Sequence, residues 1–154
     1  MKKIKPAALG CISNFSFLRG ASHPHEMIQA AAEQGWGCCG IADCDTVAGL
    51  VRAHQAAQEQ SVKLLCGTRL AVSYVEDMAI PSKAVEVIIY AANRTGYEAL
   101  CQLLSRLNMA QAHLPATQRP ARLPVHASEL SRLGQNVYII IDAPSDIPAE
   151  FIAF

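Results

Sequence analysis

The chain has 154 residues, of which 51% are hydrophobic and 17% are charged. This composition is typical of one globular domain with a substantial core, and it excludes a disordered chain. Thirteen Lys and Arg residues balance thirteen Asp and Glu residues. The net charge therefore gives no general attraction for nucleic acid, so a DNA contact would need a local patch or another part of a larger protein.

The first half of the chain alternates short apolar runs with helical patterns. Residues 7–12 and 37–43 predict buried strands, and Ser22 is a suitable N-cap for a helix between them. A second helix is expected after the second strand. The residues suited to cap it are Asp45 and Thr46.

The second half continues in the same way. Residues 63–75 and 85–92 predict two strands that pair as a hairpin, and Thr95 with Glu98 forms a capping-box pattern at the start of a long helix. Residues 110–126 contain three prolines and two arginines but no acid, which predicts a loop.

A last buried strand is predicted at residues 136–142. The order strand–helix–strand–helix–strand implies crossover connections, and apolar strands without alternation indicate a sheet covered on both faces. The sequence therefore predicts an α/β fold with a largely parallel sheet, formed by residues 1–154 as a single domain.

The six cysteines lack the paired spacing of a structural zinc site, so we expect reduced thiols packed as small hydrophobes. No apolar stretch approaches the roughly 20 residues of a membrane helix. Lys5 and Pro6 also leave too short an apolar run for a signal peptide. These features predict a cytoplasmic protein with no membrane partner.

Four ordered blocks carry a family resemblance: "SNFSFLRGASHPHEMIQAAAEQGW", "GIADCDTVAGLVRAH", "KLLCGTRL" and "NRTGYEALCQLLSRL". Together they resemble the N-terminal polymerase and histidinol phosphatase (PHP) domain of bacterial DNA polymerase III alpha subunits, and the error-prone branch in particular. The resemblance implies a partial or distorted PHP-type (β/α) barrel. It also implies a segment of a longer polymerase, because the later metal motifs have no counterpart after residues 136–142.

The family's metal-binding pattern can be carried over by position. Its His-x-His falls on Gly10 and Ile12, its Asp-His on Asp43 and Cys44, and the Glu of its Gly-x-Glu on Arg69. Two ligand positions therefore lack a donor atom and a third carries a fixed cation, whereas catalytic zinc sites use three protein ligands. We expect a vestigial site, no cofactor, and a local structural role for Asp43 beside the next helix or in an ion pair with Arg69.

The resemblance implies that the whole protein is a DNA-directed DNA polymerase, a nucleotidyltransferase that works in DNA repair and translesion replication. This segment alone is expected to support the polymerase or its accessory subunits, to reach DNA only through the full-length protein, and to lack catalytic residues. Arg119 and Arg122 are interpreted as part of a solvated linker, so no nucleic-acid-binding residue is assigned, and His54 is interpreted as a core residue.

Two alternatives remain open at this point. One is a free-standing phosphoesterase with a rebuilt site, in which Asp43, Cys44, His23 and His25 would hold zinc or manganese and the metal would generate hydroxide. The other is a scaffold domain without chemistry. An incomplete barrel leaves an unpaired sheet edge, through which the chain could associate with a second copy.

Overall fold

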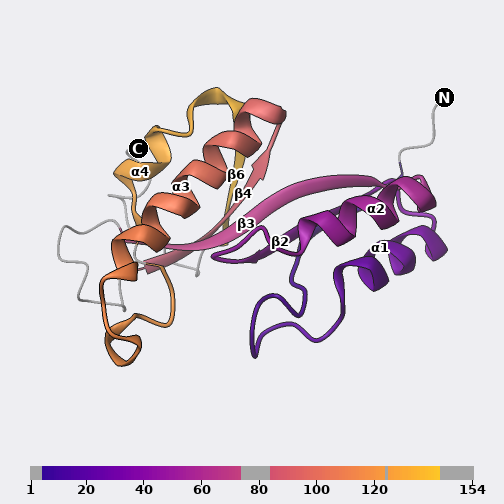
Figure 1. Cartoon of the computed structure of the whole chain (residues 1–154). Coiled ribbons are helices and arrows are strands. Elements are labelled where there is room, and N and C mark those ends of the chain that lie inside the picture. Colours follow the sequence, from indigo (N-terminus) through magenta and orange to yellow (C-terminus); the bar gives the residue numbers. More distant parts are fainter. Residues whose placement is uncertain (1–4, 74–83, 124, 143–154) are drawn as a thin grey trace. The chain divides into compact units, whose positions relative to one another are not determined.

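The structure is a computed structural model that describes residues 5–73, 84–123 and 125–142. The chain forms two compact units, Met1–Thr68 and Arg69–Phe154, which Figure 1 colours from indigo to magenta and from magenta to yellow. Each unit contains strands with packed helices, as expected for an α/β fold.

The first unit consists of two strand–helix repeats. Its elements are β1 (Ala7–Cys11), α1 (Pro24–Glu33), β2 (Cys38–Cys44) and α2 (Leu50–Gln60). Strands β1 and β2 pair in parallel, as the crossover connection requires, and α1 lies against both α2 and β2 (Figure 1). The strands and helices predicted for this half are confirmed to within a few residues.

The helix caps differ from the sequence predictions. His23, not Ser22, precedes α1, and its backbone N–H donates to Glu26 Oε2 at 2.7 Å. Gly49 precedes α2, whereas Thr46 instead accepts the backbone N–H of Ala48 at 3.1 Å in a turn before the helix. The Thr46 prediction failed because a Ser or Thr near a helix start serves a turn as readily as a cap.

Small residues let α2 pack closely in its unit. Leu50, Ala53 and Ala57 are its buried residues, and they recur at helical spacing. The sequence places Val51 and His54 on the same apolar helix face as Leu50, but Val51 is 67% exposed and His54 is exposed as well. His54 is therefore a surface residue and not a core residue.

The second unit begins within a long strand, and the last of its described strands is exposed. Its elements are the C-terminal part of β3 (Lys63–Ser73), β4 (Ala84–Ala91), α3 (Arg94–Ala112), β5 (Val125–His126), α4 (Ser128–Ser131) and β6 (Val137–Asp142), with 3-10 turns at Ala116–Gln118 and Gly134–Asn136. The segment predicted as a loop, 110–126, thus contains the end of α3, one turn and a short strand.

Helix α3 packs on β4 through Leu100, Leu103 and Leu104, which are 5% exposed or less. Its N-cap is Asn93, whose side chain accepts the backbone N–H of Gly96 at 3.0 Å. The predicted Thr95–Glu98 box therefore does not form the cap, and Glu98 Oε1 instead pairs with Arg94 Nε at 2.9 Å.

The sheet is mixed and not purely parallel. Strand order is β1-β2-β3-β4-β6, and β5 pairs with β3. The β1–β2 and β3–β5 pairs are parallel, whereas β4 and β6 are antiparallel. The prediction overlooked that a strand following the long α3 can return beside β4 in the opposite direction.

Strand β6 was predicted to be buried, and this was wrong. Tyr138 is 68% exposed, and Ile139, Ile140 and Ile141 are 36–43% exposed. Their register partners on β4 are at most 6% exposed. The apolar side chains are therefore buried on both faces of β4 but exposed on both faces of β6.

Among the described residues, no helix is long and apolar enough to cross a membrane.

Candidate metal centre

Asp43 lies at the end of β2 with 2% of its surface exposed, and its carboxylate accepts three hydrogen bonds. Oδ1 accepts the backbone N–H of Ser13 and the hydroxyl of Ser16, both at 2.7 Å. Oδ2 accepts the hydroxyl of Ser13 at 2.6 Å. A buried carboxylate requires such donors, and here the loop after β1 provides them.

The two serine hydroxyls are oriented by further hydrogen bonds. Ser16 Oγ accepts the backbone N–H of Cys44 at 2.9 Å, and Ser13 Oγ accepts the backbone N–H of Phe15 at 3.2 Å. Each hydroxyl therefore uses its one proton on Asp43 and a lone pair on a backbone amide. Both serines are at most 2% exposed, so this network is a closed part of the first unit's interior.

Further protein groups lie close to Asp43. Thr68 Oγ1 donates to the backbone carbonyl of Asp43 at 2.9 Å. At Gly49, an added Cβ would lie 3.1 Å from Asp43 Oδ2 and 3.0 Å from both Phe15 and Pro24, which is closer than side chains normally pack. The expected acceptor role of Asp43 is present, but its donors come from the loop after β1 and not from α2.

Cys44, the other residue that could have bound a metal, faces a cation. Arg19 Nη1 donates to its Sγ at 3.3 Å. A guanidinium stays protonated at all relevant pH values, so it opposes the approach of a divalent ion to this sulfur. The Asp43 carboxylate and the Cys44 sulfur are thus both engaged in hydrogen bonds within the protein.

The first two motif positions offer no side-chain metal ligand, and the backbone is irregular around the first of them. Gly10 has φ +71°, a conformation that favours glycine, and the β1–β2 register shifts between Ala8 and Cys11. A histidine at position 10 would have to adopt this strained backbone or rebuild the end of β1. Ile12 contributes only carbon atoms.

Arg69, at the third motif position, belongs to an ion-pair cluster in the second unit. Its Nη1 lies 3.1 Å from Glu86 Oε2 and 2.8 Å from Asp142 Oδ2, and its side chain is 8% exposed. Arg122 Nη1 contacts Glu86 Oε1 at 2.6 Å, and its Nη2 donates to the backbone carbonyl of Arg69 at 3.2 Å. Arg122 is therefore part of this cluster and not of a solvated linker.

The position of Arg69 between two carboxylates has an electrostatic explanation. Glu86 and Asp142 are register partners on the antiparallel strands β4 and β6, where two like charges destabilise the pairing. Arg69 donates to both carboxylates and so bridges them. The structure thus gives Arg69 two acidic partners in its own unit, while Asp43 is satisfied by serines within the other.

The two histidines considered as replacement ligands are exposed and stack on each other. The rings of His23 and His25 have centroids 5.4 Å apart and are tilted by 14°. His23 Nδ1 lies 3.0 Å from Asn14 Nδ2. Within the described ranges, no three His, Cys, Asp or Glu side chains come together in a way that could hold a metal ion.

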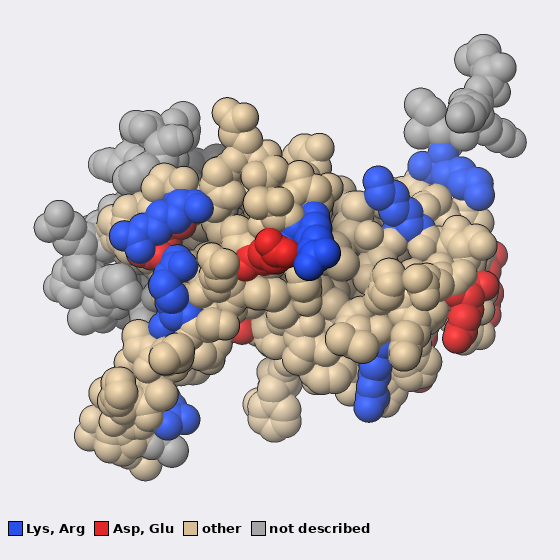
Figure 2. All heavy atoms as spheres, turned by 45° about the horizontal axis from the view of Figure 1, so that its top comes forward, with Lys and Arg blue, Asp and Glu red and all other residues tan. Residues whose placement is uncertain are grey.

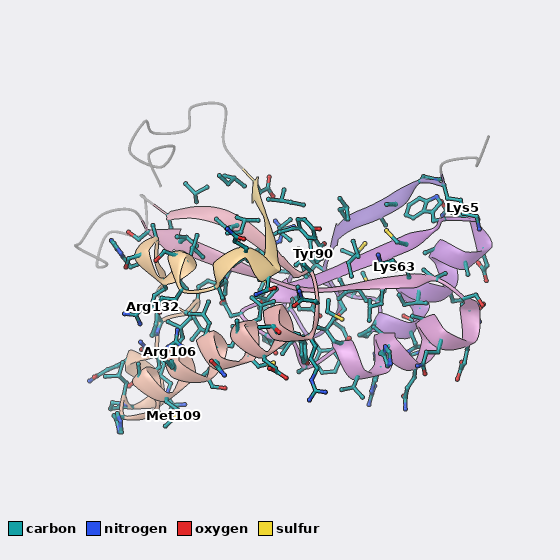
Figure 3. The ribbon with its side chains drawn as sticks, turned by 90° about the horizontal axis from the view of Figure 1, so that it is seen from above. Lys5, Lys63, Tyr90, Arg106, Met109 and Arg132 are labelled. Carbon is teal, nitrogen blue, oxygen red and sulfur yellow. The ribbon has the colours of Figure 1, made fainter. Side chains whose placement is uncertain are left out.

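The described Lys and Arg side chains are dispersed over the face that Figure 2 shows. On the face in Figure 2, basic groups stand singly or beside acidic ones. Figure 3 labels Arg106 on α3 and Arg132, which directly follows α4, and each lies 3.1 Å from a carboxylate oxygen of Glu129. Arg119 donates to the backbone carbonyls of Leu114 and Ala112.

The sequence analysis missed Ser13 and Ser16, which are the residues that hold Asp43. A usable signal was present, because two serines three positions apart directly follow an apolar strand. At the C-terminal end of neighbouring parallel strands, such a loop meets the residue that ends the next strand. The expected adjacency of the two parallel strands therefore predicts contacts of Ser13 and Ser16 with Asp43.

The fold and this strand-end cluster define an α/β protein of the class whose polar residues gather where parallel strands end. A family profile described as "PHP domain" matches residues 9–140. The chain therefore belongs to the PHP domain family.

Curated relatives are much longer than this chain. An "Error-prone DNA polymerase" of Anaeromyxobacter sp. (strain K) is 37% identical over 116 residues, which are 75% of this chain and 10% of that protein. The protein of the same name from Bordetella parapertussis is 33% identical over 149 residues, or 96% of this chain and 14% of its own length. The chain thus spans about a tenth of the relatives it matches.

Solved structures support the fold alone. An amidohydrolase from Chromobacterium violaceum, solved with sulfate and no metal, superposes with a TM-score of 0.53 at 24% identity, covering 68% of this chain and 34% of that one. A Bifidobacterium adolescentis protein, named provisionally as a metal-dependent phosphoesterase, gives 0.52 at 24% identity and covers 70% and 35% of the two chains.

Proposed function

We propose that this chain is a PHP-type module of an error-prone DNA polymerase III alpha-like protein, and that it has lost the metal site and kept a structural role. The names and identities of the polymerase relatives support the first part. The hydrogen-bonded state of Asp43 carries the second part, because three short bonds from Ser13 and Ser16 occupy both carboxylate oxygens. Gly10, Ile12 and Arg69 supply no ligand to compensate.

In this proposal the whole protein adds deoxynucleotides to a primer in the cytoplasm during repair of damaged DNA. The module itself contacts the rest of the polymerase or its accessory subunits and reaches DNA only through them. The dispersed charge in Figure 2 supports this reading, because tight phosphate binding depends on clustered Lys and Arg side chains.

A free-standing phosphoesterase is the competing proposal, and it requires a metal held by Asp43, Cys44, His23 and His25. The geometry disfavours that ligand set, since Cys44 faces Arg19 and the two histidines stack on each other.

A hydrolysis assay separates the two proposals. We expect the purified chain, supplied with zinc or manganese, to release no nitrophenol from a nitrophenyl phosphate ester above a protein-free blank. Cys44→Ser should leave that result unchanged, and a PHP-type phosphoesterase serves as the positive control. Metal-dependent release that falls at least ~10-fold in Cys44→Ser would establish a rebuilt site instead.

We also propose that the free edge of β6 pairs with β6 of a second copy of this chain. In the part of the chain that the structure describes, β6 ends the strand order and has exposed apolar residues on both faces. An antiparallel pairing centred on Ile140 would set Tyr138 opposite Asp142 and Ile139 opposite Ile141. No two like charges would then face each other across the new pair.

Analytical ultracentrifugation tests this pairing. We expect a concentration-dependent dimer at micromolar protein, and Ile140→Lys should restore a monomer because it places two cations opposite each other. Lys at an exposed site on α2, Val51→Lys, is the matched control and should still dimerise. A wild-type chain that remains monomeric at the highest soluble concentration would rule out the second copy as occupant.

A further inference from the structure

Two thiols in the first unit lie close together without being bonded. Cys39 Sγ is 3.9 Å from Cys11 Sγ, and both residues are free cysteines. Cys39 on β2 is 1% exposed, whereas Cys11 at the end of β1 is partly exposed. An S–S bond is about 2.05 Å long, so the two sulfur atoms must approach by roughly 1.9 Å.

The local backbone can accommodate this approach. Strand β1 lies at one end of the strand order, and its pairing with β2 is irregular between Ala8 and Cys11. An irregular edge strand shifts more readily than one hydrogen-bonded regularly on both sides. Gly10, with its positive φ, precedes Cys11 directly and adds backbone freedom.

The chemistry of the two thiols is unequal. The hydrogen bond from Cys39 lowers the pKa of Cys11 to about 7, even though burial acts in the opposite direction. Donating that bond, together with burial, raises the pKa of Cys39. Cys11 is thus the nucleophile at neutral pH, and Cys39 is the protonated neighbour that can resolve an oxidised Cys11.

We propose that Cys11 and Cys39 form a peroxide-sensitive thiol pair that closes to a reversible disulfide between β1 and β2. The oxidant is a hydroperoxide such as hydrogen peroxide. Cys11 sulfur attacks one peroxide oxygen, an S–O bond forms as the O–O bond breaks, and the departing hydroxide is protonated to water. Cys11 becomes a sulfenic acid while the peroxide is reduced.

Cys39 sulfur then attacks Cys11 sulfur. The S–S bond forms, the S–O bond breaks, and the departing hydroxide takes the Cys39 proton to give a second water. Two thiols and one hydrogen peroxide thus yield one disulfide and two waters. The bond would fix the end of β1 directly beside Ser13, which holds Asp43. This inference does not depend on the polymerase assignment or on the state of the metal site.

Peptide mass spectrometry of the full chain tests the pair. After brief treatment with dilute hydrogen peroxide and alkylation, we expect a cross-linked peptide containing positions 11 and 39, which dithiothreitol converts back to two alkylated peptides. Cys11→Ser and Cys39→Ser should both lose it. Cys66→Ser is the matched control and should keep it, because Cys66 is outside the pair and burial raises the pKa of its thiol, which makes it less reactive.

Alkylation rates give a second readout that needs no variant. Iodoacetamide should label Cys11 at least ~10-fold faster than Cys66 at pH 7, and the rate at Cys11 should fall as the pH drops below about 7. A wild-type chain in which peroxide leaves Cys11 as an unresolved sulfenic or sulfinic acid, or links it to another cysteine, would overturn the proposal.

Discussion

Replacement of Asp43 by alanine should lower the free energy of unfolding by about 3–5 kcal/mol, which corresponds to a melting temperature lower by roughly 10–15 °C. The reason is that the Ser13 hydroxyl, the Ser13 backbone N–H and the Ser16 hydroxyl would lose their acceptor inside the first unit. Each buried donor left unsatisfied costs about 1–3 kcal/mol. Urea denaturation followed by circular dichroism measures the change.

A graded series makes this prediction specific to the hydrogen bonds. Asp43→Asn should cost less, about 1–2 kcal/mol, because Oδ1 keeps two donors and only the Oδ2 acceptor is lost. Glu59→Ala, an exposed change on α2, should alter stability by less than about 0.5 kcal/mol. Equal stability of Asp43→Ala and the wild type would show that the carboxylate does not hold the loop after β1.

Replacement of Arg69 by methionine should cost about 2–4 kcal/mol, because Glu86 and Asp142 would then face each other across β4 and β6 without a bridging cation. The value is below that for a fully buried pair, since the side chain of Asp142 is 61% exposed and water screens it. Methionine keeps much of the arginine's length and apolar contact, so the change isolates the charge.

Two further variants separate this effect from a loss of packing. Asp142→Asn in the Arg69→Met background should recover at least about 1 kcal/mol by removing one of the facing charges. Arg94→Met, which removes a pair whose arginine side chain is 92% exposed, should change stability by less than about 0.5 kcal/mol. A cost for Arg69→Met no larger than that for Arg94→Met would contradict the bridging role.

Apolar periodicity predicted most of the elements because it reports burial directly. The strand at β2 and the helix at α3 are evident from their residues, and the four sequence blocks alone indicate the family that the profile match shows. The caps were less predictable, since Ser22, Thr46 and Thr95 each had a plausible local partner. Which residue caps a helix depends on where the preceding strand directs the chain.

Two results depended on tertiary context that the sequence does not display. The residues of β6 are as apolar as those of a central strand, so their exposure follows only from the strand's place at the end of the order. Similarly, the acids that Arg69 contacts lie 17 and 73 positions away along the chain. The residue type alone makes Arg69 an unsuitable metal ligand, whereas its pairing with Glu86 and Asp142 depends on the fold.

Metal stoichiometry tests the central claim most directly. The purified chain would be equilibrated with excess zinc or manganese, passed through a desalting column, and analysed for metal and protein. With both Asp43 oxygens engaged by serines, we predict far less than one ion per chain, and no difference between the wild type and Asp43→Asn. Close to one tightly held ion per wild-type chain, absent from Asp43→Asn, would contradict this description of the site.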